Sequence, residues 1–193
     1  AANNSAFGHR ALDANTTGAQ NTALGSGALG ANTTADNNTA IGYNSLTANT
    51  TAGSNTAVGA YTLTSVTTGD QNTAVGRGAL SDNTGSTNTA VGYNALTSNT
   101  SASGNTAVGR RALEVNTTGA SNTALGSSAL DANTTGSYNT AIGVNTLDAN
   151  TTASNNTAIG YAALAASTTS SSHVAVGYQA LEDNTTGNAS TAV

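Results

Sequence analysis

A single pattern of apolar and polar residues repeats along the whole chain. Every copy opens on a polar residue, usually Asn, which is typically followed by Thr, Ala, an aliphatic residue and Gly. Complete copies begin at Asn4, Asn21, Asn38, Asn55, Asn72, Asn88, Asn105, Asn122, Asn139, Asn156 and His173. Ten of these eleven copies contain 17 residues, one contains 16, and an incomplete copy begins at Ser190. A fixed period of this length is typical of a solenoid, in which each repeat covers the apolar face of its neighbour. The sequence therefore predicts one repeat array over residues 1–193, with complete coils over residues 4–189.

Two apolar positions recur in every complete copy when positions are counted from the initial polar residue. Position 4 is always apolar and mostly β-branched, which favours a strand, and position 9 is always Leu. Because side chains of a strand alternate between its faces, an inward position 4 would place the Thr of position 2 inside as well. The Ala of position 3 would then face outward. We expect the rows at positions 4 and 9 to form the core.

Two turns complete each predicted coil. Position 5 is Gly in every complete copy, which indicates either a positive φ or a lack of room for a Cβ atom against the next coil. Positions 12 to 15, typically Asn-Thr-Thr-Gly, form the second turn, where stacked Asn side chains can bond the coils on either side. We therefore expect two short strands per coil and an all-β parallel solenoid. At about 4.8 Å per coil, eleven coils give a rod about 50 Å long.

The composition excludes several alternatives to this architecture. Aromatic residues make up 4 % of the chain and charged residues 7 %, too few for an ordinary globular core. Disorder usually accompanies high charge and lacks a regular pattern, whereas the large aliphatic residues here return at fixed positions. The net charge is -5 with only four Arg, so nucleic acid is not an expected partner. No apolar run is long enough to insert in a bilayer, and without Cys neither disulfides nor thiolate metal sites can form.

A row of small residues has two possible explanations. An outward position has no reason to stay small in every copy, so the Ala of position 3 either packs against a turn of its own chain or lets neighbouring chains approach. The second explanation predicts a homotrimer or a similar bundle. The candidate subunit-packing ladder is Ala40, Ala57, Ala74, Ala90, Ala107, Ala124, Ala141 and Ala158.

Aromatic and basic residues concentrate at positions 6 and 7 of the repeat. Tyr and Arg dominate contact energies at many interfaces, so these positions are either ordinary solvent-exposed residues of a turn or a binding edge. The candidate binding edge consists of Tyr43, Tyr61, Arg77, Tyr93, Arg110, Arg111, Tyr161 and Tyr178.

The repeat offers no convergent set of unlike residues for catalysis, so an enzyme is not expected. His9 and His173 occupy different positions of the repeat and lie almost the full rod apart. No cofactor is expected. A built-in metal site is not expected either, because the Gly-Gly-x-Gly-x-Asp pattern of calcium-binding rolls is absent. The Thr pairs at positions 13 and 14 allow one further hypothesis, because regular arrays of Thr can order water at an ice surface.

The first eight positions resemble a known family of repeats. Asn55–Thr62 reads NTAVGAYT and Asn88–Ala95 reads NTAVGYNA. Both are similar to the NSxAIGxxA head repeats of YadA-like trimeric autotransporter adhesins, and similar NTAxGxxAL units occur in phage and bacterial tail-fibre-like surface proteins. The resemblance implies a left-handed parallel β-roll with three chains side by side. It also implies that the roll projects from a cell or virion and contacts a host surface, a matrix protein or a glycan.

Three functions follow as hypotheses from these observations. The first is an extracellular rod of a surface fibre that is structural and adhesive and associates with copies of itself. The second is a structural filament whose subunits stack end to end. The third is an ice-binding protein that uses its Thr arrays.

Overall fold

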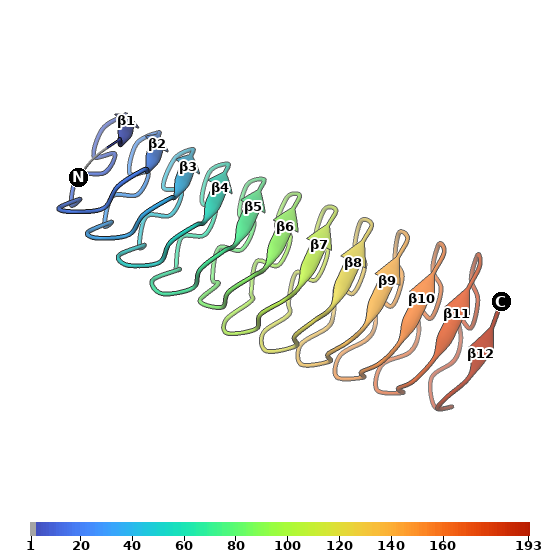
Figure 1. Ribbon diagram of the computed structural model, residues 1–193. Helices are drawn as coiled ribbons and strands as arrows, with labels where there is room; N and C mark the ends of the chain where they lie inside the picture. Colours follow the sequence, from blue (N-terminus) through green and yellow to red (C-terminus); the bar gives the residue numbers. More distant parts are fainter. Residues whose placement is uncertain (1–2) are drawn as a thin grey trace.

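The computed structural model describes residues 3–193 and shows an all-β parallel solenoid (Figure 1). Twelve short strands form one sheet in the order β1 to β12, so each coil pairs with the next along the chain. The strands are β1 Ser5–Phe7, β2 Thr22–Leu24, β3 Thr39–Ile41, β4 Thr56–Val58, β5 Thr73–Val75, β6 Thr89–Val91, β7 Thr106–Val108, β8 Thr123–Leu125, β9 Thr140–Ile142, β10 Thr157–Ile159, β11 Val174–Val176 and β12 Thr191–Ala192. The predicted solenoid architecture and the tandem repeat are confirmed.

Neighbouring coils stack in register, so each repeat position forms a row along the rod. Ala6 pairs with Ala23 between β1 and β2, and Ala90 pairs with Ala107 between β6 and β7. The 16-residue coil keeps this register, because Ala74 still pairs with Ala90. A missing turn residue therefore does not displace the strands that follow it.

Each coil contains one strand, and the prediction of two is wrong. Positions 7 and 9 adopt positive φ in all eleven complete coils, with values between 48° and 54° for the Leu of position 9. Left-handed backbone is uncommon for a residue as bulky as Leu, and the sequence gives no glycine signal for it. The segment after Gly of position 5 therefore turns instead of extending, and positions 8 and 9 are both buried in every complete coil except the first and the last.

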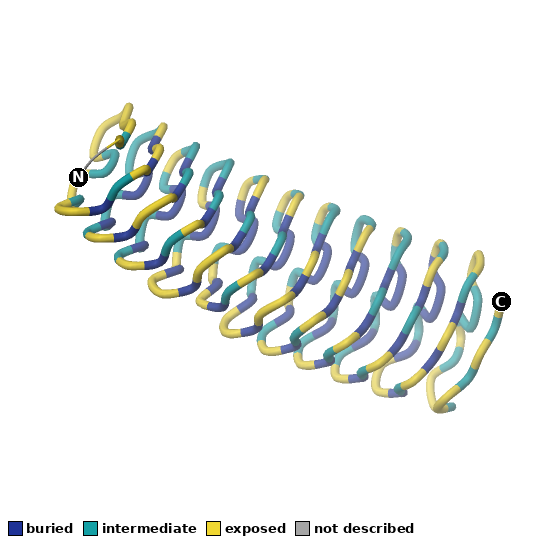
Figure 2. The backbone as a smooth tube through the Cα atoms, in the orientation of Figure 1, coloured by how far each residue is buried: buried dark blue, intermediate teal, exposed yellow. Residues whose placement is uncertain are grey.

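The inward and outward positions of the strand are opposite to those predicted. The position 3 Ala is at most 1 % exposed in β2 to β11, whereas no aliphatic side chain of position 4 is buried (Figure 2). The interior is narrow at this level because Leu and the small residues of position 8 fill it, so only a methyl group fits. The larger aliphatic side chains must face outward.

The predicted subunit-packing ladder consequently lies inside the coil. Its side chains are Ala40, Ala57, Ala74, Ala90, Ala107, Ala124, Ala141 and Ala158, and each is 0 % exposed. These methyl groups pack against their own chain, which was the other explanation of their constant size. A contact between chains would have to use the outward positions instead.

The narrow coil buries its surface efficiently. The chain exposes 7614 Å², whereas a compact globular protein of 18.6 kDa exposes ~8,200 Å². Nine Leu of position 9, from Leu29 to Leu164, are fully buried. A single chain therefore buries at least as much of its surface as a compact globular protein of the same mass.

A ladder of buried Asn side chains at position 1 closes each coil onto itself and onto the next. The Nδ2 of Asn105 donates to the carbonyl of Gly119, which is position 15 of the same coil, at 2.9 Å. Its Oδ1 accepts from the backbone N–H of Asn122 in the next coil at 2.9 Å. The same two bonds recur along the rod, and at His173 the imidazole Nδ1 takes over as acceptor for Ser190 N–H.

A second Asn ladder runs through position 12 and is interrupted twice. Asn116 donates to the Oδ1 of Asn99 at 2.9 Å, as the prediction of stacked Asn side chains required. Val66 and Ser167 break the row. The Oδ1 of Asn150 and the Oγ of Ser167 are buried without a hydrogen-bond partner. Serine is too short to reach the amide of the preceding coil.

Replacing Ser167 with Asn should restore the second ladder and stabilise the protein. The new Nδ2 would donate to Asn150 Oδ1, and satisfying a buried acceptor contributes about 1–2 kcal/mol. Urea denaturation followed by circular dichroism measures the change in the free energy of unfolding. Ser167→Ala is the control, because it removes one unpaired oxygen without completing the ladder. An Asn variant no more stable than the Ala variant would contradict this account.

Candidate functional site

The eight residues of the candidate binding edge lie along one narrow edge of the rod. Positions 6 and 7 follow directly after the strand and its Gly, so they form the turns toward which the strand arrows point in Figure 1. These turns are mostly exposed or partly exposed (Figure 2). The five predicted Tyr of this edge range from 42 % exposed at Tyr61 to 73 % at Tyr178.

Four of these residues form one continuous cluster across four consecutive coils. The rings of Tyr43 and Tyr61 meet edge to face, with centroids 5.3 Å apart. The guanidinium carbon of Arg77 lies 5.9 Å from the ring centroid of Tyr61 and 5.8 Å from that of Tyr93. Arg77 Nη1 also lies 3.5 Å from the Tyr93 hydroxyl. We name Tyr43, Tyr61, Arg77 and Tyr93 the tyrosine–arginine cluster.

The other predicted residues do not join this cluster. Tyr161 and Tyr178 stack on each other, with centroids 5.4 Å apart and an interplanar angle of 12°. Arg110 and Arg111 occupy one coil between the two groups. The candidate binding edge is thus divided into an aromatic and basic part near its middle and a separate Tyr pair further along.

Arg111 is engaged by two carboxylates that the sequence did not connect with the edge. Its Nε bonds Glu114 Oε2, three residues along the chain, and its Nη2 lies 3.4 Å from Asp131 Oδ2 in the next coil. The hydrogen bond that Arg111 donates to Glu114 raises the pKa of the Arg111 guanidinium, and burial raises the pKa of Asp131. Both acids occupy position 10 of the repeat. The i, i+3 spacing of Arg111 and Glu114 was the available signal.

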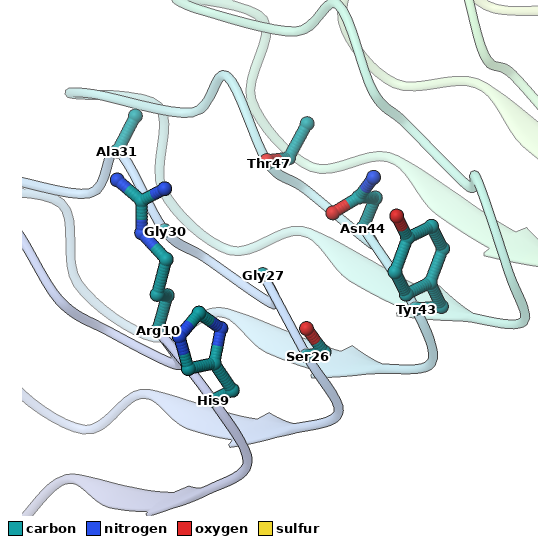
Figure 3. A pocket seen from close by; sticks show the side chains of 9 residues that line it. All are labelled: His9, Arg10, Ser26, Gly27, Gly30, Ala31, Tyr43, Asn44 and Thr47. Atoms are coloured by element: carbon teal, nitrogen blue, oxygen red, sulfur yellow. The ribbon is translucent and has the colours of Figure 1, made fainter.

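A shallow hollow borders the cluster on the side of Tyr43. Figure 3 shows the side chains of His9, Ser26 and Tyr43 on successive coils, with Arg10 beside His9. The hollow has a volume of about 440 Å³, and Gly27 contributes to its lining without a side chain to fill it. Small residues between larger ones therefore leave an open recess next to the tyrosine–arginine cluster.

The Thr side chains of position 13 are used by the solenoid itself. Thr117 Oγ1 donates to the carbonyl of Thr134 at 2.9 Å, and Thr134 Oγ1 donates to that of Thr151 at 3.0 Å. Similar bonds occur in most coils, for example from Thr16 to Thr33. These hydroxyls stabilise the stack, so they are less available to order water than the sequence suggested.

No group of three or more His, Asp or Glu side chains is arranged to hold a metal ion within residues 3–193. In that same part of the chain, no helix could span a membrane. Comparisons with protein-family models, with curated proteins and with solved structures gave no match. The resemblance to YadA-like head repeats consequently stays a prediction from the repeat motif.

Proposed function

We propose that the chain is a rigid rod of a multi-chain surface fibre and that its candidate binding edge, at positions 6 and 7, is adhesive. The observation that carries this proposal is the outward face of the sheet formed by β1 to β12, which we call the sheet face. Apart from Ser5 and Phe7 in β1, its two outward rows consist of Thr and aliphatic side chains, and no strand within residues 3–193 contains a charged residue. Exposed apolar strips of this length usually mark an interaction surface.

A second copy of the chain is the partner that fits the sheet face. Copies share the same spacing between coils, so one parallel copy can meet another at every coil. The face is about 50 Å long and about 10 Å wide, which gives roughly 1,000 Å² for two chains together, near the lower limit of a specific interface. Three chains around a common axis would cover the face of each, in keeping with the trimers that the resembling adhesins form.

The test of this proposal is the mass of the assembly in solution, measured by light scattering over a range of concentrations. Three copies of 18.6 kDa give about 56 kDa. Replacing Val75, Val91 and Val108 together with Asp should yield single chains with an unchanged circular dichroism spectrum, because three buried carboxylates would oppose association. Wild-type chains that stay single, or a triple variant that keeps the wild-type mass, would refute the proposal.

A matched control places the same charges elsewhere on the rod. Position 11 already carries Asp82, so Asp at Ser65, Ser98 and Ala149 adds equal charge away from the sheet face. This variant should keep the mass of the wild type. Loss of association in the control would mean that net charge, and not the sheet face, determines the assembly.

Ice binding is a second candidate, and we infer that it would use the sheet face instead of the Thr pairs at positions 13 and 14. The Thr of position 2 and the aliphatic residues of position 4 form two aligned outward rows on the strands. Within the described chain, hydroxyls such as those of Thr73, Thr89 and Thr106 make no hydrogen bond to protein atoms. A flat array of methyl groups and free hydroxyls could order water. Single chains with thermal hysteresis would favour this function over the fibre.

A further inference from the structure

The candidate binding edge contains two Arg side chains that are not paired with a carboxylate within residues 3–193, and an aromatic ring lies between them. Arg77, Tyr93 and Arg110 occupy position 6 of three consecutive coils. Arg77 and Arg110 are exposed, and Tyr93 is 47 % exposed. Because the coils are about 4.8 Å apart, the two Arg positions are separated by about 10 Å along the rod.

The charge of these two Arg side chains is available to a ligand. Among the described residues, neither Arg77 nor Arg110 forms an ion pair with a carboxylate, whereas Arg10 lies 3.5 Å from Asp13. Arg111 is held by Glu114 and Asp131. Two of the four Arg side chains, Arg77 and Arg110, are therefore without a carboxylate partner within residues 3–193, and both lie in the row formed by position 6.

The rings on either side of Arg77 hold its guanidinium in place. Contacts of 5.9 and 5.8 Å to the centroids of Tyr61 and Tyr93 are within the range of cation–π attraction. One N–H donor, on Nη1, lies 3.5 Å from the Tyr93 hydroxyl, and within residues 3–193 none of the Arg77 donors is paired with a carboxylate. A planar guanidinium with free N–H groups binds carboxylates through two parallel hydrogen bonds.

We propose that this edge binds an acidic polysaccharide that carries one carboxylate on every second sugar. An extended chain of β-linked sugars advances by about one coil spacing per sugar, so alternate carboxylates would face Arg77 and Arg110. The neutral sugar between them lies on the exposed ring of Tyr93. The polysaccharide runs parallel to the rod axis and continues past Tyr61 toward Tyr43 and the hollow beside it (Figure 3).

This inference rests on the proposed function in one respect, because the edge must stay exposed when sheet faces pack together. The edge and the sheet face use different positions of the repeat, 6 and 7 against 2 and 4. Each can therefore be altered without the other. Assembly mass reports on the sheet face, and polysaccharide binding reports on the edge.

The experiment measures binding of a hyaluronan decasaccharide by isothermal titration calorimetry at low ionic strength. We expect saturable binding that weakens as salt is added, since the ion pairs are exposed. Arg77→Gln together with Arg110→Gln should weaken binding by about tenfold or more. Ser137→Asp together with Ser154→Asp is the matched control, because it lowers the net charge by the same two units at position 16, away from the edge, where Asp36 and Asp70 already occur, and it should leave the affinity within about twofold.

Two further comparisons test the contribution of the ring and the need for charge. Tyr93→Phe retains the stacking surface and should bind as the wild type does, whereas Tyr93→Ala should bind about tenfold more weakly. A neutral cello-oligosaccharide of the same length should bind at least tenfold more weakly than hyaluronan. Absent hyaluronan binding, equal binding of the neutral oligosaccharide, or equal losses in the control and in the double variant would overturn the inference. Unchanged assembly mass in every variant separates these outcomes from a failure of the fibre proposal.

Discussion

Replacing Gly92 with Ala is expected to destabilise the protein by about 3–5 kcal/mol, through backbone strain and a clash that no rotamer can relieve. Gly92 has a φ of 142°, which L side chains rarely adopt. A Cβ atom added there would lie 2.3 Å from the carbonyl oxygen of Gly109 and 2.7 Å from its carbonyl carbon. Both atoms are backbone of the next coil, so the two coils would have to separate. The in-register pairing of β6 with β7 is then lost or weakened.

Urea denaturation measures the total loss of stability, and hydrogen exchange locates it. Coils of a solenoid contact only their neighbours, so the amides of β6 and β7 should lose protection before those of distant coils. Gly53→Ala is the control, because its φ is not positive and the added Cβ meets a single atom, Asp36 O, at 3.2 Å. Position 16 also carries Ala19 and Ala120. A Gly92 variant as stable as this control would disprove the requirement for glycine.

The sequence was sufficient to predict the features that depend on the period of the repeat. A constant Gly indicated a positive φ or a close approach of the next coil, and Gly92 shows both. A β-branched residue beside Thr and Ala indicated a strand, and β1 to β11 each span those three positions. The recurring Asn of position 12 indicated bonds between coils, and Asn116 forms one. Each of these patterns recurs from copy to copy along the sequence, so it indicated a structural requirement and not a coincidence.

The direction of the side chains could not be predicted, because it depends on the width of the interior. The rule that large apolar residues lie inside favoured position 4, but Leu96 and its neighbours leave room only for Ala90 at position 3. Leu at positive φ has no local sequence signature either, since Gly and Asn are the residues usually found there. The chain therefore turns at position 9, where a second strand was predicted.

The candidate site was predicted as a set of residues but not as a set of contacts. Tyr and Arg at positions 6 and 7 identified the edge, and the structure places all eight on it. Two residues of the edge touch only where adjacent coils both carry a large side chain. Tyr43 and Tyr61 meet this condition, whereas Ser26, on the coil before Tyr43, is too short. The charge available to a ligand also depends on the fold, because Asp131 engages Arg111 only across the stack.

Replacing Asn105 with Ser should cost about 2–4 kcal/mol, because the closing ladder loses a donor and an acceptor inside the coil. Serine cannot reach the N–H of Asn122, and a buried N–H left without a partner costs about 1–3 kcal/mol. The hydrogen bond to the carbonyl of Gly119 contributes about 1 kcal/mol more, since Asn116 Nδ2 still donates to that carbonyl. Asn145→Ser is the matched control. The Asn145 side chain is partly exposed at position 7, where Ser128 occurs in the preceding coil, so its loss should stay within about 0.5 kcal/mol. Equal losses in the two variants would show that the ladder contributes little.

Replacing Asn105 with Asp should make the stability depend on pH, because the new carboxyl has the shape of the amide but can donate a hydrogen bond only when protonated. Protonated, it can donate to Gly119 O and accept from Asn122 N–H; ionised, it places a buried charge against that carbonyl oxygen. Burial and the facing oxygen raise the pKa of the introduced carboxyl in the folded state above its unfolded value of about 3.9. A raised pKa means that the folded state binds the proton more tightly, so the stabilising contribution is complete below about pH 3.9 and is lost as the pH rises through the folded-state pKa. The difference in unfolding free energy from the wild type, measured by urea denaturation at pH 4 and pH 7, should therefore be larger at pH 7. An equal difference at both pH values would mean that the carboxyl has escaped to solvent and that Asn105 does not close the coil in the way its hydrogen bonds indicate.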